Sequence, residues 1–210
     1  VAKSFASEGA KVFLAGRTKE TLDAVASEIR VNGGEAETDV VDALDEASVN
    51  EYVDSVADRA GRIDVSFNLI STHDVQKPLM EISVEDFLKP IMNATRSGFL
   101  TSRAAARHMV EQASGVILQF GGGGPQTMPG LGGFKISLDA LESLRRQLAC
   151  ELGAYGIRVV TLKTGGVPET VPDDFAAKDA ITASITEATL LKRPATLTDV
   201  GNVAAFVASD

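Results

Sequence analysis

The sequence predicts a doubly wound α/β fold, in which helices cover both faces of a parallel sheet. Short apolar segments bounded by glycines alternate with longer amphipathic segments along the chain. The clearest case lies within residues 115–166, where GVILQFGGGG, a long amphipathic helix and GIRVVTLKTGG follow one another as a βαβ unit. Continuous apolar strands with β-branched residues are typical of a parallel sheet. We therefore expect the chemistry of this protein at the mouth of this unit.

Length and composition predict a single domain over residues 1–210. The chain is 44% hydrophobic, which supplies one sizeable core. A net charge of −9 and a pI of about 4.8 argue against nucleic acid or an anionic membrane as partner. A single cysteine, Cys150, excludes an internal disulfide, and its leucine-rich surroundings predict a buried side chain. Without a long apolar run or a signal-peptide layout, the protein is expected to be cytoplasmic and free of membrane.

The first half of the chain reads as helices and strands in alternation. A helix over residues 1–7 is followed by Gly9 and a strand over 11–15, as is typical of an αβ connection. The next elements are a helix over 19–31, a strand over 35–40, a helix over 44–60 and a buried strand within 63–70. Asn32 and the two glycines after it end the helix over 19–31.

The second half holds the longest helices. A mainly helical segment over residues 84–109 precedes the βαβ unit, whose own helix carries leucines at intervals of three and four. An irregular acidic segment and a weak helix then run to residue 191. A last helix spans residues 198–208, and Thr198 with Asp199 supplies capping chemistry at its start.

Both ends of the sequence depart from the order expected of this fold. Such a domain normally opens with a strand and a glycine turn that lead into its first helix, and a strand follows its last helix. The first strand lies in the middle of the sheet, so its absence leaves neighbouring strand edges unpaired. We therefore expect a sheet that lacks this strand with its glycine loop and the last strand, in a domain incomplete at both ends. A gapless sheet would contradict this hypothesis.

Several dispersed segments resemble the short-chain dehydrogenase/reductase family, in the right order and at the right intervals. They are EGAKVFLAGR, TDVVD, GRIDVSFN, GFLTSRAAARHM, LACELGAYGIRVV and TDVGNVAAFVASD. The resemblance implies a Rossmann-type fold that binds NAD or NADP at the carboxyl ends of the strands. It also implies hydride transfer to or from an alcohol or carbonyl. The family uses Tyr-x-x-x-Lys on the helix of the βαβ unit, a serine on the strand before it, and an asparagine on the preceding helix.

The resemblance assigns five residues to the cofactor. Arg17 matches the position where a cation meets the 2′-phosphate of NADP, which favours NADP over NAD, although a solvated arginine is the alternative. Asp39 matches an aspartate that contacts adenine, with Val40 beside it, and a helix or turn cap is an equally weighted alternative. Asn68 and Gly165 complete the set. The family's glycine-rich phosphate loop would precede the first residue.

The strand that ends at Asn68 departs from the family pattern. Leu69, Ile70 and Ser71 stand where the family has Asn-Ala-Gly. Bulky residues at a position where glycine lets the backbone approach the cofactor are expected to crowd the ribose side of the pocket.

The catalytic positions depart further. The family spacing places Gly121 at the serine, Phe134 at the tyrosine and Leu138 at the lysine. The asparagine position falls on Ala94, one residue after Asn93. Phe134 has no ionisable proton and Leu138 no charge, whereas the family chemistry needs a phenol whose pKa an ammonium lowers. Loss of a positioned acid or base typically costs about 10²–10⁴ in rate.

Three residues are weak candidates to substitute for the missing groups. His73 lies at the correct end of the sheet for a general acid, although a surface histidine is the commoner case. Lys135 is next to Phe134, but helical geometry turns it about 100° away. Asn93 is the third candidate. The four glycines 121–124 form either an anion-binding nest or a flexible loop. Two distant histidines and one cysteine predict no metal site.

Two hypotheses of function follow. The first is a divergent NAD(P)-linked oxidoreductase that acts on an unidentified small alcohol or carbonyl compound. The second is a non-catalytic protein that binds a dinucleotide or a partner on the same fold. The helices around Arg103 and Leu144 are the usual oligomer faces of the family, so the resemblance implies a homodimer or homotetramer.

Overall fold

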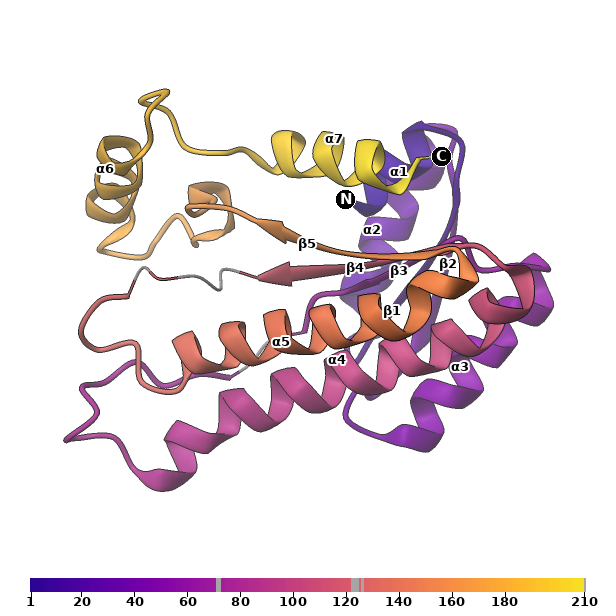
Figure 1. The fold of residues 1–210 in the computed structure, drawn as a ribbon. Coiled ribbons are helices and arrows are strands. Elements are labelled where there is room, and N and C mark those ends of the chain that lie inside the picture. The colour runs from indigo at the N-terminus through magenta and orange to yellow at the C-terminus, as the bar shows by residue number, and fades with distance from the viewer. Residues whose placement is uncertain (71–72, 122–124, 126, 210) are drawn as a thin grey trace.

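The computed structural model describes residues 1–70, 73–121, 125 and 127–209, which form an α/β domain with helices on both faces of parallel strands (Figure 1). This confirms the predicted fold class. In the first half the elements are α1 (Ala2–Ser7), β1 (Lys11–Gly16), α2 (Lys19–Val31), β2 (Glu35–Val40), α3 (Glu46–Ala60) and β3 (Val65–Asn68). In the second half they are α4 (Val84–Gln112), β4 (Gly115–Gly121), α5 (Phe134–Leu152), β5 (Ile157–Lys163), α6 (Lys178–Ala188) and α7 (Leu197–Ala208).

The described strands form two parallel sheets rather than one. β1 pairs with β2, and β4 lies between β3 and β5. A cleft of about 1690 Å³ separates the two sheets and is lined by β1 and β3 together with residues of α1, α3 and α7. The backbone edges of β1 and β3 that line this cleft have no strand partner among the described residues. The expected unpaired edges are therefore present, and a strand ahead of the first residue stays a prediction.

Each face of the β3–β4–β5 sheet buries its own apolar cluster. The larger cluster joins this sheet to α3, α4 and α5, with Met109 and Ile117 almost fully buried at its centre. The smaller cluster joins the opposite face to α1 and α7 through Leu118, Leu162 and Ala204. Full burial of one such large apolar side chain contributes about 1.5–3 kcal/mol. This packing fixes the sheet against α4 and α5 (Figure 1).

Close backbone approach fixes α5 against α4. A Cβ at Gly98 of α4 would lie only 2.8 Å from Leu141 of α5. A Cβ at Gly133, just before α5, would overlap the carbonyl oxygen of Phe87 in α4. Only glycine fits at this second position, so the start of α5 is held directly over the first turns of α4.

Two sequence-based predictions about helices are wrong in detail. Cys150 is exposed, because it lies on the solvent side of α5 while Leu148 faces the core. The N-cap of α7 is Thr196 rather than Thr198, and Asp199 completes a capping box with it. Hydrophobic spacing predicts where a helix lies more reliably than it predicts which residue begins the helix. Among the described residues, no helix is both long and apolar enough to cross a membrane.

Candidate active site

The carboxyl ends of β3, β4 and β5 meet at one edge of the sheet, as parallel strands require. β3 ends at Asn68, β4 at Gly121 and β5 at Lys163. The start of α5, at Phe134, lies beside this edge, and α6 lies beyond it (Figure 1). The chain therefore brings the predicted mouth of the βαβ unit together as a candidate site.

The three positions that the resemblance predicts for catalysis carry no acid, base or charge. Gly121 ends β4, and a Cβ there would lie 3.4 Å from the Cγ2 of Thr161, so the position has room for a small side chain. Phe134 and Leu138 are half-buried, one helical turn apart on α5. The first turns of α5 therefore present the benzyl group of Phe134 and the isobutyl group of Leu138.

Neither tyrosine of the chain reaches this edge. Tyr52 is held between α3 and β1, where its hydroxyl donates a hydrogen bond to the carbonyl oxygen of Phe13 at 3.2 Å. Tyr155 lies in the 3₁₀ turn Gly153–Tyr155, which leads into the amino end of β5. No described phenol therefore stands in for the one that Phe134 lacks.

An amine, however, does lie at this edge, and the sequence analysis missed it. Lys163 is the Cα register partner of Gly121 across β4 and β5. Its ammonium lies 3.5 Å from Oε2 of Glu142 on α5. The other carboxylate oxygen of Glu142 accepts two hydrogen bonds from the Arg145 guanidinium, at 3.0 and 2.8 Å. Two cations and one carboxylate thus gather beside Gly121.

The charges around Glu142 keep it ionised. Burial acts to raise the pKa of this carboxyl, but the hydrogen bonds from Arg145 and Thr161 and the charges of Arg145 and Lys163 outweigh it. The pKa of Glu142 is therefore lowered. Its side chain is only 15% exposed, whereas that of Lys163 is 43% exposed. The carboxylate is the inner member of the pair, and the ammonium faces the edge.

A row of polar side chains crosses the sheet just below this pair. Asn68, Gln119 and Thr161 are register partners on β3, β4 and β5. They point toward α4 and α5, because the residues two positions earlier on β4 and β5 belong to the cluster under those helices. Gln119 is 2% exposed.

Buried atoms of this row have no hydrogen-bond partner among the described residues. They are Asn68 Oδ1 and both side-chain polar atoms of Gln119. A buried polar group without a partner costs about 1–3 kcal/mol. Because an apolar row would be more stable, a functional reason for these residues is the better explanation.

The predicted cofactor residues lie along the mouth of the cleft. Arg17 follows β1 and His73 lies in the loop after β3, and the cleft is lined by both. An Nη2 of Arg17 lies 3.2 Å from Nε2 of His73. His73 therefore lies on the Arg17 side of the site. Asn68 also lines this cleft, and Gly165 is exposed two residues beyond β5.

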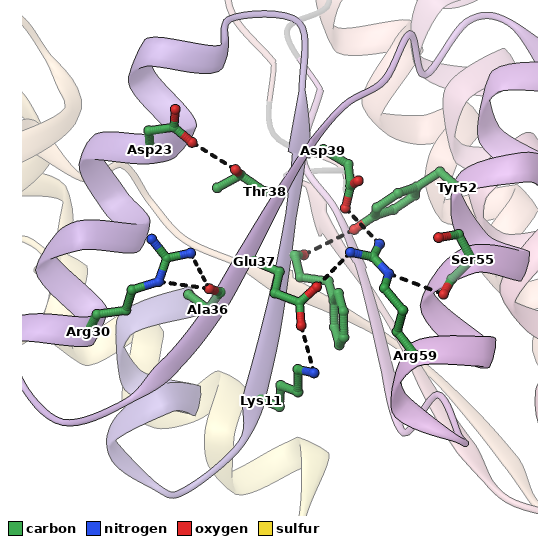
Figure 2. A network of polar contacts seen from close by, with 11 residues as sticks. Lys11, Asp23, Arg30, Ala36, Glu37, Thr38, Asp39, Tyr52, Ser55 and Arg59 are labelled. Atoms are coloured by element: carbon green, nitrogen blue, oxygen red, sulfur yellow. Dashed lines mark hydrogen bonds and ion pairs between the residues drawn. The ribbon is translucent and has the colours of Figure 1, made fainter.

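Asp39 is engaged in a network that the sequence did not show (Figure 2). Its carboxylate accepts a hydrogen bond from Arg59 of α3 at 2.8 Å, and Arg59 also binds Glu37 at 2.6 Å. Lys11 pairs with the same Glu37 at 2.6 Å. Asp39 thus fastens β2 to α3, and its predicted contact with adenine stays a prediction, as does a role for the exposed Val40 beside it.

The remaining candidates are not drawn together. Lys135 pairs with Asp139 one turn along α5, on the helix itself. Asn93 is half-buried on α4, and Ala94, at the family's asparagine position, is buried. Ser71 and glycines 122–124 lie outside the described residues, so the anion nest stays a prediction. Among the described residues, no three or more His, Cys, Asp or Glu side chains gather as a metal site requires.

Comparison with known proteins decides the family. A family model described as enoyl-(acyl carrier protein) reductase matches residues 1–210. The chain is 32% identical over 165 residues to levodione reductase of Leifsonia aquatica, an alignment covering 77% of this chain and 62% of that protein. It is 28% identical over 215 residues to the uncharacterized oxidoreductase YxbG of Bacillus subtilis (strain 168), covering 100% of this chain and 79% of that protein. The chain belongs to the short-chain dehydrogenase/reductase family.

Solved structures agree on the fold of this family member. A levodione reductase structure matches with a TM-score of 0.89 at 27% identity, covering 100% of this chain and 85% of that chain. A xylitol dehydrogenase with bound NAD⁺ matches with the same TM-score at 23% identity, covering 100% and 86%. A metagenomic short-chain oxidoreductase in complex with NADP matches at 0.78 and 24% identity, covering 100% and 83%. These likenesses show that the chain has the fold of the short-chain dehydrogenase/reductase family.

Proposed function

We propose that this chain is an NAD(P)-linked oxidoreductase of divergent type, which acts on a small alcohol or carbonyl compound without the usual Ser-Tyr-Lys set. The observation that carries the proposal concerns the carboxyl edge of β3, β4 and β5. In a chain with the family fold, polar side chains lie at this edge, near Gly121. When bound, the cofactor would supply or accept a hydride at this edge. The substrate would lie over Phe134 and Leu138, which give it an apolar floor.

The residues at the mouth of the cleft fit a phosphorylated dinucleotide. The Arg17 guanidinium lies 3.2 Å from Nε2 of His73, and its remaining N–H groups suit a phosphate group. Leu69 and Ile70, both exposed beside them, offer apolar surface to a base or ribose. The pair supports a preference for NADP over NAD, since only NADP carries a 2′-phosphate.

A second function is favoured by one specific observation. Gly121, Phe134 and Leu138 together form a consistent apolar surface rather than a half-broken catalytic set. A family member with such a surface could hold the dinucleotide or a partner without turning it over. We propose this as the alternative, and turnover separates the two.

The test is a titration of the full-length protein with NADPH and NADH, followed by turnover against a panel of small ketones and aldehydes. We expect NADPH to bind at least about tenfold more tightly, because a charged hydrogen bond contributes about 1.5–3 kcal/mol. We also expect measurable oxidation of NADPH with at least one carbonyl compound. Binding without any turnover would support the alternative, and no binding of either cofactor would contradict both.

The Arg17→Ser variant checks the basis of the cofactor preference. It removes the cation at the cleft mouth, so the Kd for NADPH should rise by about 10–100-fold. The Kd for NADH should stay within about twofold. Lys19→Ser, two residues later and paired with Asp23 on α2 at 3.1 Å, is the matched control and should leave both values unchanged. Equal weakening of both cofactors by Arg17→Ser would contradict a contact with the 2′-phosphate.

A further inference from the structure

Lys163 and Glu142 form an ion pair beside Gly121 that the family resemblance does not account for. Lys163 is the last residue of β5, and Glu142 lies in the middle of α5. The inference drawn from this pair rests on the proposed oxidoreductase function. It concerns the group that handles the proton once Phe134 has replaced the phenol.

The geometry brings the Lys163 ammonium to the helix face that carries the family positions. Glu142 lies one turn after Leu138 and two turns after Phe134, so all three share one face of α5. The 3.5 Å contact with Glu142 therefore holds the ammonium against this face. Because Lys163 pairs in register with Gly121, its stem starts at the carboxyl edge of the sheet. The lysine side chain thus reaches α5 one helical turn beyond Leu138 and two turns beyond Phe134.

The polar row below the pair is an independent observation that points to chemistry here. The side chain of Gln119 is almost fully buried with no partner for its amide among the described residues. Thr161 beside it is half-buried and is engaged with Glu142. Thr161 lies two residues before Lys163 on the same strand face. Amide and hydroxyl dipoles at this level make the interface polar, whereas Ile117 and Val159, two positions earlier on β4 and β5, are apolar. A charged pair is tolerated in such surroundings.

We propose that Lys163 is the proton donor of this site in carbonyl reduction and the proton acceptor in alcohol oxidation, with Glu142 as its positioning residue. In reduction, the bound cofactor would supply the hydride that bonds to the carbonyl carbon, and the π-electron pair would move onto oxygen. An N–H bond of the Lys163 ammonium breaks as the O–H bond of the alcohol forms. The neutral amine then takes a proton from solvent, which its exposed side admits. Oxidation runs the same transfers in reverse.

The other candidate groups are less well placed for this role. Lys135 is paired with Asp139 along the helix. His73 contacts Arg17 at the mouth of the cleft, on the side that we assign to the cofactor phosphate. Arg145 holds Glu142 and, as a guanidinium, does not release a proton at working pH.

The decisive variant is Lys163→Ala, assayed with the carbonyl compound that the wild type reduces best. We expect kcat to fall about 10²–10⁴-fold, the usual loss for a positioned acid or base, with the Kd for NADPH within about twofold. Added ethylamine or propylamine should restore part of kcat, because a small amine can occupy the space of the removed side chain. A merely structural lysine would not be replaced by a free amine.

Lys11→Ala is the matched control. Lys11 is likewise a strand lysine paired with a glutamate, Glu37, but it lies at the amino end of β1. Its kcat should match the wild type and should not respond to amines. Turnover by Lys163→Ala within about threefold of the wild type would overturn this inference alone. A wild type that turns over no carbonyl compound would overturn the proposed function and this inference with it.

A cofactor-free measurement tests the pair itself. Thermal unfolding of the wild type, Glu142→Gln, Lys163→Ala and the double variant forms a double-mutant cycle. If the two groups interact as described, the effects on Tm should fail to add by about 2 °C or more. Strict additivity would overturn the positioning role. In the assay, Glu142→Gln should lower kcat about tenfold at unchanged KM, and that loss should disappear in the Lys163→Ala background.

Discussion

Single residues at the sheet edge decide what chemistry is open to this family member. Phe134 and Leu138 keep the bulk of a tyrosine and of a lysine stem and lose the proton and the charge. Lys163 of β5 brings an ammonium to the same edge of the sheet, 3.5 Å from Glu142. Our proposal is that this ammonium takes over the proton transfer, while the strand ends keep the family arrangement.

If the edge retains that arrangement, the family's own residues should work when they are put back. Gly121→Ser, Phe134→Tyr and Leu138→Lys together, made in the Lys163→Ala background, should raise kcat by about 10²–10⁴-fold. Gly121 has room for the serine, since its Cβ would meet Thr161 Cγ2 at 3.4 Å. Phe134→Tyr alone should gain less than about tenfold, because a phenol without a nearby ammonium keeps a pKa near 10. The measurement is NADPH oxidation under saturating substrate.

A folded triple variant that binds NADPH and shows no gain would contradict the retained geometry. Circular dichroism and the NADPH titration establish folding and binding. Gly121→Ser alone serves as the control, because it adds a hydroxyl without any acid or base.

The assignment of the catalytic positions from the sequence stays a prediction, and the sequence did not single out Lys163 or Gln119. Gly121, Phe134 and Leu138 follow from fixed spacing along one strand and one helix. Lys163 and Gln119 belong to neighbouring strands, and only the register of β4 with β5 brings them to the same site. A signal was present, since a glutamine within GVILQFG and a lysine at the end of IRVVTLK interrupt otherwise apolar strands. Cross-strand neighbours are what a single sequence leaves undetermined.

At the scale of elements, α3 is fastened to the β1–β2 sheet by polar contacts that no local pattern predicts. Arg59 binds Glu37 and Asp39, and Tyr52 donates to the Phe13 carbonyl (Figure 2). These partners are about twenty to forty residues apart in sequence. The element boundaries, by contrast, follow from hydrophobic periodicity and glycine placement, which are local.

Tyr52 should make the protein lose stability at alkaline pH. Burial, aided by the charge of Asp39, raises the pKa of Tyr52 above its ordinary value of about 10. Because this pKa is raised in the folded state, the contribution of Tyr52 to the free energy of unfolding is complete below pH 10. It is lost as the pH rises beyond 10. The slope is at most about 1.4 kcal/mol per pH unit. Urea unfolding at pH 8 and pH 11 measures this loss of stability. The part of the loss that Tyr52 causes should be absent from Tyr52→Phe.

At pH 8, Tyr52→Phe should lower the free energy of unfolding by about 0.5–1.5 kcal/mol, because the hydrogen bond to the Phe13 carbonyl oxygen is lost. Tyr155→Phe is the control, since Tyr155 is 48% exposed and lies outside the network. An unchanged alkaline slope in Tyr52→Phe would show that the phenol does not report on the α3–β1 contact.

At the scale of the whole molecule, two surfaces remain open to solvent. One is the cleft between the two sheets, and the other is the exposed side of α4. The cleft between β1 and β3 separates the sheets, and apolar side chains of α4 remain in solvent. These are Val84, Leu88, Met92 and Phe99. Their spacing places several of them on one side of the helix, and the Arg103 guanidinium lies 4.9 Å from the Phe99 ring centroid. An exposed apolar stripe of this kind marks an interaction surface.

We propose that α4 and α5 form the interface of a homodimer or homotetramer, as the family resemblance implies. Light scattering should then give about two or four times the chain mass of 22.0 kDa. Phe99→Glu places a charge at the C-terminal end of the stripe, where burial without a partner is costly, so it should yield the monomer mass. Phe175→Glu, at a site of similar exposure before α6, should leave the assembly intact. A wild type that runs as a monomer at micromolar concentration would show that the stripe serves another partner or none, and the same mass for wild type and Phe99→Glu would remove α4 from the interface.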